Sequence, residues 1–240
     1  MNETPSVAQY ILWYVLSYAL IAGAAYLATT RFLTRFFADR RLRGAADPTQ
    51  IRAEIARSTV AILVYVGMTF LTAFLYFRGH TRIYAVVAEY GWFWYAASFF
   101  VFVALHDTYF YWTHRWMHLP GILRRFHGAH HASVDPTPFT AHSFHFVEAV
   151  IQATFFVAVA VLVPFHWSAF LLLYAYSTAV NVYGHVGYDV LGRHRDCGPL
   201  AYFNHPSSHA WHHAHGEGNY GLYFNLWDRA MGTYRGHLDQ

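Results

Sequence analysis

Long apolar runs alternate with short polar segments along this chain. An apolar run of about 20 residues is long enough for a helix to cross a bilayer. The pattern predicts four to five membrane helices, over residues 8–29, 58–77, 91–111, 146–163 and 167–183. A polar linker over 31–57 contains a break at 44–49, and the last two runs form a hairpin around Pro164. The predicted fold is therefore an all-α integral membrane protein.

The same pattern predicts a single membrane domain over residues 1–240. Its first part, about 1–90, would hold the N-terminal membrane helices and the linker. Its second part, about 91–240, is rich in histidine and would carry the chemistry. We see no repeat of fixed period and no second domain.

Composition favours a membrane protein. Apolar residues make up 56% of the chain and charged residues only 12%, which is about half the charged fraction of a usual soluble domain. The net charge of +3 is too small and too dispersed to indicate nucleic-acid binding. The single cysteine, Cys197, excludes an internal disulfide and an all-cysteine metal site. The N-terminus lacks the basic segment of a secretory signal peptide, so we expect the run over 8–29 to span the bilayer.

The basic residues, all of them arginine, indicate an orientation. Seven lie in the linker over 31–57, three between 115 and 125, and four after the hairpin. Only Arg78 and Arg82 fall between the second and third runs. Because cytoplasmic loops carry the excess of positive charge, we expect the arginine-rich segments, and the histidine stretches near them, to face the cytoplasm.

Three short stretches place histidines at helical spacing. They read HRWMH, HGAHH and HAWHH, and residues three or four apart on a helix share a face. One tetrahedral zinc takes four ligands, so eight imidazoles suit two metals side by side. Imidazole accepts zinc, copper, iron or nickel, and the ligand type alone does not identify the metal. The candidate metal ligands are His114, His118, His127, His130, His131, His209, His212 and His213.

Adjacent histidines can serve different metals. His130 and His131 diverge by about 100° around a helix axis, so each can face one metal. His212 and His213 repeat this arrangement after Pro206.

Four further residues are candidates for the site. Asp107 lies seven residues before His114 on the same helix face, and a carboxylate there could accept the far N–H of a ligand imidazole. His142 and His145 lie three apart at the start of the hairpin, and His185 follows its end. For these three histidines the sequence leaves a ligand role and an ordinary buried role open.

Some motifs are absent. The chain has no HExxH zinc-protease motif and no GxGxxG or GxxxxGK[ST] nucleotide-binding loop. We therefore expect no bound nucleotide, and any electrons would come from a separate carrier.

A metal transporter is the alternative from another functional class, but it would need ionisable ligands within the membrane spans. A haem carrier with two axial histidines is a further alternative, which an optical spectrum would reveal.

The order HxxxH, HxxHH, HxxHH resembles the sterol desaturase and fatty acid hydroxylase superfamily. The likeness extends over about 105–235, through DTYFYWTHRWMH, RFHGAHH, PTPFTAHSFHFVEA and SHAWHHAHGEGNYGLYFNLWDRAMGTYR. TPFTAHSFH followed by NYG and LWDR is most similar to the sterol desaturase branch. The resemblance implies a non-haem di-iron centre, held by the eight histidines together with His185, with zinc as a substitute in purified protein.

The resemblance also implies an activity and its partners. We expect a membrane enzyme that uses dioxygen to hydroxylate or desaturate an unactivated C–H bond of a sterol-like, fatty acyl or isoprenoid lipid. Its electrons would come from a ferredoxin-like or small haem carrier with its reductase. The short chain and its all-arginine basic residues favour a bacterial inner membrane, with the metal site facing the cytoplasm.

Overall fold

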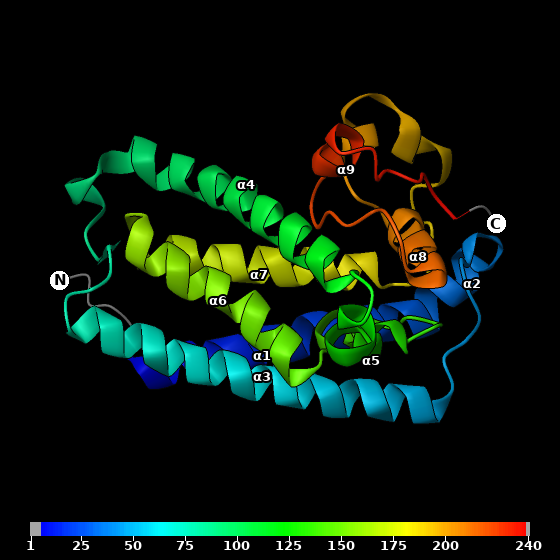
Figure 1. Cartoon of the computed structure of the whole chain (residues 1–240), viewed down its shortest axis with the longest axis horizontal. Coiled ribbons are helices and arrows are strands. Elements are labelled where there is room, and N and C mark those ends of the chain that lie inside the picture. Colours follow the sequence, from blue (N-terminus) through cyan, green and yellow to red (C-terminus); the bar gives the residue numbers. More distant parts are fainter. Residues whose placement is uncertain (1–5, 239–240) are drawn as a thin grey trace.

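Five long helices run back and forth along one axis in the computed structural model, which describes residues 6–238 (Figure 1). The N-terminal end of α1 and the loop between α3 and α4 lie at one end of this bundle, and α8 lies at the other. The long helices are α1 (Val7–Ala28), α3 (Pro48–Phe77), α4 (Gly91–Met117), α6 (Phe146–Leu162) and α7 (Trp167–Gly184).

Short elements connect the long helices. The α-helical ones are α2 (Thr34–Phe36), α5 (Gly128–His131), α8 (Pro206–His215) and α9 (Leu226–Ala230). Two π-helical turns are η1 (Thr29–Leu33) and η4 (Leu123–His127). The 3₁₀ turns are η2 (Ala38–Arg40), η3 (Val87–Glu89), η5 (Pro138–His142), η6 (Gly192–Asp196) and η7 (Gly198–Tyr202). The only strands among residues 6–238 are β1 (Ile83–Tyr84) and β2 (Phe165–His166), which pair in parallel.

The structure confirms the mostly helical fold and corrects the predicted linker. The predicted run over 58–77 is the second half of a longer helix, because α3 already begins at Pro48. Asp47 caps this helix by accepting from the backbone N–H of Thr49 and Gln50. A Pro at the first helical position after such a cap is a helix start, so the predicted break ends at Asp47 and the second part of the linker, from Pro48 on, is helical.

The third predicted run lies within a longer helix, which continues into the HRWMH stretch as the spacing of its histidines predicts. Helix α4 extends beyond residue 111 to Met117, and His118 forms its C-cap. A turn follows, in which Gly121 has a positive φ of 83°. A positive φ costs glycine no steric strain, so Gly121 permits the turn that separates α4 from the next histidine stretch.

The outer surface of the bundle is more apolar than parts of its interior. On α3 the buried positions are Glu54, Ser58, Ala61 and Tyr65. Small and polar residues between helices, with large apolar ones outside, are typical of helices that pack within lipid. Large apolar side chains that are more than half exposed include Leu12, Leu20, Leu27, Leu63, Phe70, Phe74, Trp92, Phe93 and Phe100.

Two segments of the described chain are long and apolar enough to cross a membrane, over Val7–Phe36 and Pro48–Phe77. Helix α6, at 17 residues, is apolar but shorter. Helices α4 and α7 are long enough, but they carry many aromatic and polar residues. The total of four to five spans therefore stays a prediction.

The N-terminal helices share a core with the histidine-rich part. Tyr14 from α1 and Tyr65 from α3 belong to one buried cluster with Ala153 of α6 and Tyr174 of α7. The division of the domain near residue 90 stays a prediction of the sequence.

Glu54 anchors the loop that precedes α6. This buried carboxylate accepts hydrogen bonds from Thr137, from Thr140 at 2.9 Å and from Gln50 at 2.8 Å. The loop is thereby fastened to α3, and the position of α6 depends on it.

Replacing Glu54 with alanine is expected to destabilise the protein by about 2 kcal/mol, because buried hydroxyl groups lose their acceptor. For a chain of this size that corresponds to a fall of roughly 4–8 °C in the melting temperature, measurable by thermal unfolding in detergent. Glu89→Ala, at an exposed position, is the control and should leave the melting temperature unchanged. An equal melting temperature for both variants would contradict this role of Glu54.

Candidate metal centre

Nine histidines meet at the end of the bundle where α8 lies. Within each of two groups, the candidate ligand nitrogens lie within 4.8 Å of one another. The first histidine group is His114, His118, His127, His131 and His212. The second histidine group is His130, His185, His209 and His213.

Helix geometry explains this division. His114 and His118 lie one turn apart at the end of α4, so both face the first group. The adjacent pair His130 and His131 in α5 divides between the groups, as their divergence around the helix predicts.

Helix α8 divides its histidines in the same way. His212 joins the first group, whereas His209 and His213, four residues apart, join the second. The helix begins with Pro206 at its first position and ends before Gly216, which has a left-handed φ of 70°. Pro at the start and Gly just after the end are the usual boundaries of a helix.

The imidazoles approach one another through their Nε2 atoms. The separations are 3.0 Å for His114 and His127, 3.2 Å for His118 and His131, and 2.9 Å for His185 and His209. Two ligands of one ion have similar separations when metal–nitrogen bonds are about 2.0–2.1 Å long.

The protonation of the rings fits a metal. His114 Nδ1 lies 2.8 Å from the carbonyl oxygen of Tyr220, which only accepts, so this nitrogen carries the proton and Nε2 has a lone pair. His127 Nδ1 likewise donates to Glu148 at 2.6 Å. The facing Nε2 atoms of His114 and His127 thus have no proton between them, and a bound cation would satisfy both lone pairs.

His212 supports the same conclusion. Its Nδ1 donates to the carbonyl oxygen of Gly218 at 2.7 Å, which leaves Nε2 as a lone pair. This Nε2 is buried and has no hydrogen-bond partner within residues 6–238. A lone pair of this kind, beside four other imidazoles, is what a metal ligand requires.

Burial keeps the histidines neutral. It lowers the pKa of His118 and of His185 to about 4 and that of His131 to about 3. Burial also places the pKa of His212 and His213 well below the usual value. Neutral imidazole is the form that binds metal.

A short backbone segment orients the first histidine group. The carbonyl oxygens of Gly216, Gly218 and Tyr220 accept from the Nδ1 atoms of His118, His212 and His114 at 2.7–2.8 Å. Such contacts fix the ring orientation and the tautomer of a metal ligand. The side-chain pattern does not predict these contacts, because the acceptors are backbone atoms, although the glycines of GEGNYG are a signal.

Asp228 holds this segment in place. Its carboxylate accepts from the backbone N–H of Tyr220 at 2.9 Å and of Gly221 at 2.8 Å, and from the Thr233 hydroxyl at 2.7 Å. The side chain is fully buried. The LWDR motif therefore supports the histidines through the backbone, a role that sequence reasoning did not assign.

Asp107 is placed differently from the prediction. Its carboxylate accepts from the backbone N–H of Tyr223 at 2.8 Å and of Phe224 at 3.2 Å. Seven residues along a helix span about 10 Å, too far for Asp107 to reach the ring of His114. The expected contact with a ligand imidazole was wrong, and the carboxylate that makes one is Glu148.

His142 and His145 lie outside both histidine groups. His145 caps α6 by accepting from the backbone N–H of Val147 at 3.2 Å. His142 is buried against the ring of Tyr18, at a centroid distance of 4.3 Å. Of the three histidines whose role the sequence left open, the structure brings only His185 into a group.

Replacing Glu148 with alanine is expected to weaken metal binding by roughly 10- to 100-fold, because His127 loses the acceptor that orients it. Glu148→Gln keeps an acceptor and should lose less. Competition with a graded chelator series, followed by metal analysis of the protein, measures this. The exposed Glu217→Ala is the control, and a Glu148→Ala variant that binds metal like the wild type would disprove the role.

A known protein family and several known proteins are similar in sequence to this part of the chain. The profile of the family named fatty acid hydroxylase matches residues 99–233, which include all nine histidines. A Delta(7)-sterol 5(6)-desaturase of Gibberella zeae is 30% identical over 223 residues, covering 91% of this chain and 68% of that protein. Human lathosterol oxidase is 30% identical over 237 residues, covering 96% and 73%. No solved structure matches the chain significantly.

Proposed function

Because the chain belongs to the fatty acid hydroxylase family and to its sterol desaturase branch, we propose that it is a membrane-bound di-iron oxygenase. It would use dioxygen and external electrons to hydroxylate or desaturate an unactivated C–H position of a lipid. The observation that carries this proposal is the pair of adjacent histidine groups. Within the first group, the Nε2 atoms of His114 and His127 face each other without a proton between them. The metal-transporter alternative does not fit, because the relatives are named as desaturases and an oxidase.

Each histidine group would hold one iron. The first offers five imidazoles and the second four, and iron accepts imidazole ligands. Bound iron would supply the dioxygen and one-electron chemistry that amino-acid side chains lack. Purified protein could carry zinc instead, because zinc accepts the same ligands.

The residues around the histidines would control what reaches them. A cavity of about 30 Å³, here called the metal-facing cavity, touches members of both histidine groups and has Phe110, Phe144 and Leu222 in its wall. These apolar side chains would exclude water from the reacting carbon. Asp107 would act as a positioning residue, because it holds the backbone that follows Leu222.

The lipid would reach the histidine groups from the bilayer. The electrons would reach them from the aqueous side of the membrane. We propose that the arginine-rich end of the bundle faces the cytoplasm, as the charge asymmetry predicts. A ferredoxin-like or small haem carrier would deliver electrons there. The relatives reported above are fungal and human, so a bacterial inner membrane stays a prediction from composition.

Lipid analysis of cells with and without this chain tests the proposal. In the presence of oxygen, we expect a lipid that has gained one oxygen atom or lost two hydrogen atoms only where the chain is expressed. Metal analysis of the purified protein should show iron. Identical lipid profiles in both cultures, with iron present in the protein, would overturn the proposed activity.

A further inference from the structure

Four aromatic side chains connect the first histidine group with the protein surface. The ring of Tyr220 packs against three members of that group, at centroid distances of 5.1–5.7 Å. The ring of Tyr111 follows, 6.2 Å from that of Tyr220. Trp112 of α4 and Trp227 of α9 both contact Tyr111, at 5.3 and 5.9 Å, since α9 packs on the C-terminal part of α4 (Figure 1). Rings at these separations are in contact, and the four are here called the aromatic path.

The aromatic path runs from a buried end to an exposed end. Tyr220 and Tyr111 are buried, whereas Trp112 is 43% exposed. Trp112 also contacts Trp227, at a centroid distance of 5.7 Å. Tyrosine and tryptophan are the aromatic side chains that lose a single electron most readily, and every member of the path is one of these two. The path therefore has the composition of a route for single electrons.

The hydroxyl group of Tyr111 has a defined destination for its proton. Arg115 Nη1 donates to the Tyr111 oxygen at 3.1 Å, because a guanidinium group only donates. Thr233 Oγ1 donates its single proton to Asp228 Oδ1 at 2.7 Å. In the 3.0 Å contact between the hydroxyl groups of Tyr111 and Thr233, the donor is therefore Tyr111. A proton that leaves this phenol can pass through Thr233 to the Asp228 carboxylate.

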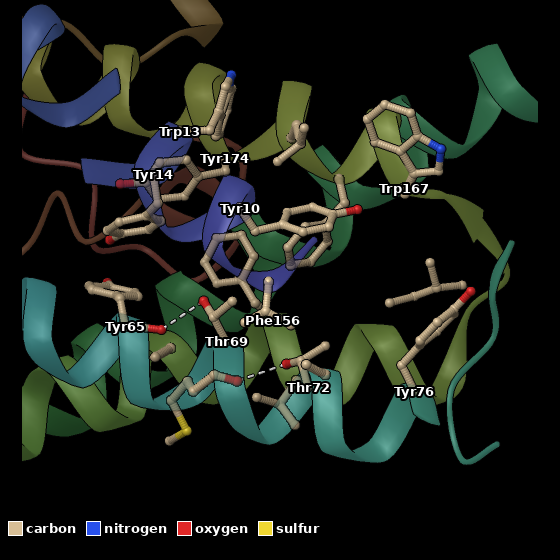
Figure 2. Close-up of a pocket in the computed structure, with 18 of the residues that line it drawn as sticks. Tyr10, Trp13, Tyr14, Tyr65, Thr69, Thr72, Tyr76, Phe156, Trp167 and Tyr174 are labelled. Carbon is tan, nitrogen blue, oxygen red and sulfur yellow. Dashed lines mark hydrogen bonds between the residues drawn. The ribbon is translucent and has the colours of Figure 1, made fainter. Parts of the chain in front are cut away.

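A second aromatic cluster lacks such a destination. Tyr14, Tyr65 and Tyr174 lie beside a cavity of about 110 Å³ between α1, α3, α6 and α7 (Figure 2). The ring of Tyr14 lies 4.0 Å from that of Tyr174 and 5.5 Å from that of Tyr65. The hydroxyl groups of Tyr14 and Tyr174 have no hydrogen-bond partner within residues 6–238. Close packing of tyrosines thus does not by itself supply a proton acceptor, and the aromatic path differs in this respect.

The proposed function gives the aromatic path a task. An oxidant that breaks an unactivated C–H bond can also oxidise a phenol, whose O–H bond is weaker, or an imidazole. With no lipid in place, such an oxidant would damage the histidines that hold the metal. Tyr220 lies against three of these histidines. A readily oxidised ring in this position protects them if its electron is quickly replaced.

We infer that the aromatic path drains unused oxidising equivalents from the metal centre to the protein surface. This inference rests on the proposed function and adds a protective activity at the same site. One electron passes from Tyr111 through the adjacent ring to the oxidised centre. The O–H bond of Tyr111 breaks, its proton passes to Thr233, and the proton of Thr233 passes to Asp228.

The later steps restore the path. An electron from Trp112, directly or through Trp227, reduces Tyr111, and the two protons return. A soluble one-electron reductant, such as ascorbate or a thiol, then reduces Trp112. The reductant thus loses the electron that the centre gains, and the path itself is unchanged. Thr233 and Asp228 are positioning residues, because they act through the proton of Tyr111.

Light-driven oxidation of the zinc-loaded full chain tests the path without turnover, since zinc has no redox chemistry. A ruthenium polypyridyl complex is attached to the thiol of Trp116→Cys, one helical turn from Trp112, in a Cys197→Ser background. A flash in the presence of a soluble electron acceptor turns this complex into a one-electron oxidant. We expect a tryptophanyl absorption signal that converts into a tyrosyl signal, more slowly in heavy water because a proton moves.

Variants in this background assign the two signals. Tyr111→Phe keeps the ring and should abolish the conversion, so that the tryptophanyl signal lasts longer. Thr233→Val should suppress the conversion in the same way, because the phenolic proton has lost its acceptor. Tyr174→Phe, a buried tyrosine of the second aromatic cluster, is the matched control and should leave both signals unchanged. An undiminished conversion in Tyr111→Phe, or no conversion in the background protein, would overturn the inference.

The iron-loaded chain tests the protective role. Reduced protein without lipid is mixed once with dioxygen, and peptide mass spectrometry locates the oxidised side chains. In the wild type we expect oxidation at Trp112 or Trp227, which added ascorbate suppresses. In Tyr111→Phe we expect oxidation of the ligand histidines, such as His114, with loss of iron.

The outcomes separate this inference from the proposed function. Equal oxidation of the ligand histidines in the wild type and in Tyr111→Phe would overturn the protective role. If the zinc-loaded path conducts but dioxygen oxidises no side chain of either iron-loaded protein, the proposed dioxygen chemistry fails and the path stands on the zinc-loaded result.

Discussion

His130→Ala and His213→Ala are each expected to abolish turnover and to remove the metal of the second histidine group. This group has only four imidazoles, and both side chains are buried within it. His130 Nε2 lies 3.4 Å from that of His185, and His213 Nε2 lies 3.2 Å from that of His209. Without either ring, three ligands remain in a buried site, too few to complete a tetrahedral set. Metal analysis and product formation measured on the same preparation check both effects.

His194→Ala is the matched control, because His194 is exposed and belongs to neither histidine group. It should keep the metal content and turnover of the wild type. Activity retained in both His130→Ala and His213→Ala would show that the site assignment is wrong.

Asp228→Ala is expected to have the largest effect on stability and to disturb the first histidine group as well. The two buried backbone N–H groups of Tyr220 and Gly221 and the partly buried Thr233 hydroxyl lose their acceptor at once. At about 1–3 kcal/mol for a buried group left unsatisfied, we expect a loss of at least about 3 kcal/mol. That corresponds to a melting temperature lower by roughly 6–12 °C. The carbonyl oxygen of Tyr220, which orients His114, moves with its peptide unit, so metal binding should weaken too.

The structural and metal-binding effects of Asp228 can be separated. Asp228→Asn keeps one acceptor oxygen and should recover part of the melting temperature and of the metal content. Asp39→Ala, at an exposed position, should change neither. If Asp228→Ala unfolds at a lower temperature but binds metal with wild-type affinity, the backbone segment does not orient the histidines.

Much of the fold was predictable because apolar runs and helix-boundary residues are local signals. The runs over 146–163 and 167–183 correspond closely to α6 and α7. The start of α3 was missed because its first turns carry Arg52 and Glu54, which interrupt the apolar pattern without interrupting the helix. A hydropathy pattern therefore locates the apolar part of a helix but not the residues at which the helix begins and ends.

The candidate site was predictable for a related reason. Histidines three and four apart share a helix face, and adjacent ones diverge, so the division of His130 from His131 follows from spacing. The contact of Glu148 with His127 joins residues that are 21 positions apart, and it depends on how η4 packs against α6. The predicted contact between Asp107 and a ligand imidazole was wrong, because two residues on one helix face can still be too far apart along the helix axis.

The backbone carbonyls that orient the first histidine group have a consequence for engineering. A scan that replaces side chains one by one leaves these oxygen atoms in place, so most substitutions in this segment would report nothing about them. Gly218 is one position where a side chain would disturb them, because an added Cβ would lie 2.5 Å from Arg235 Cγ and 2.6 Å from the carbonyl oxygen of Thr233. Its φ of 64° is also unfavourable for other residues. The affinity of the histidine groups for a metal would therefore be adjusted at a glycine, a residue that has no side chain to contribute to the site.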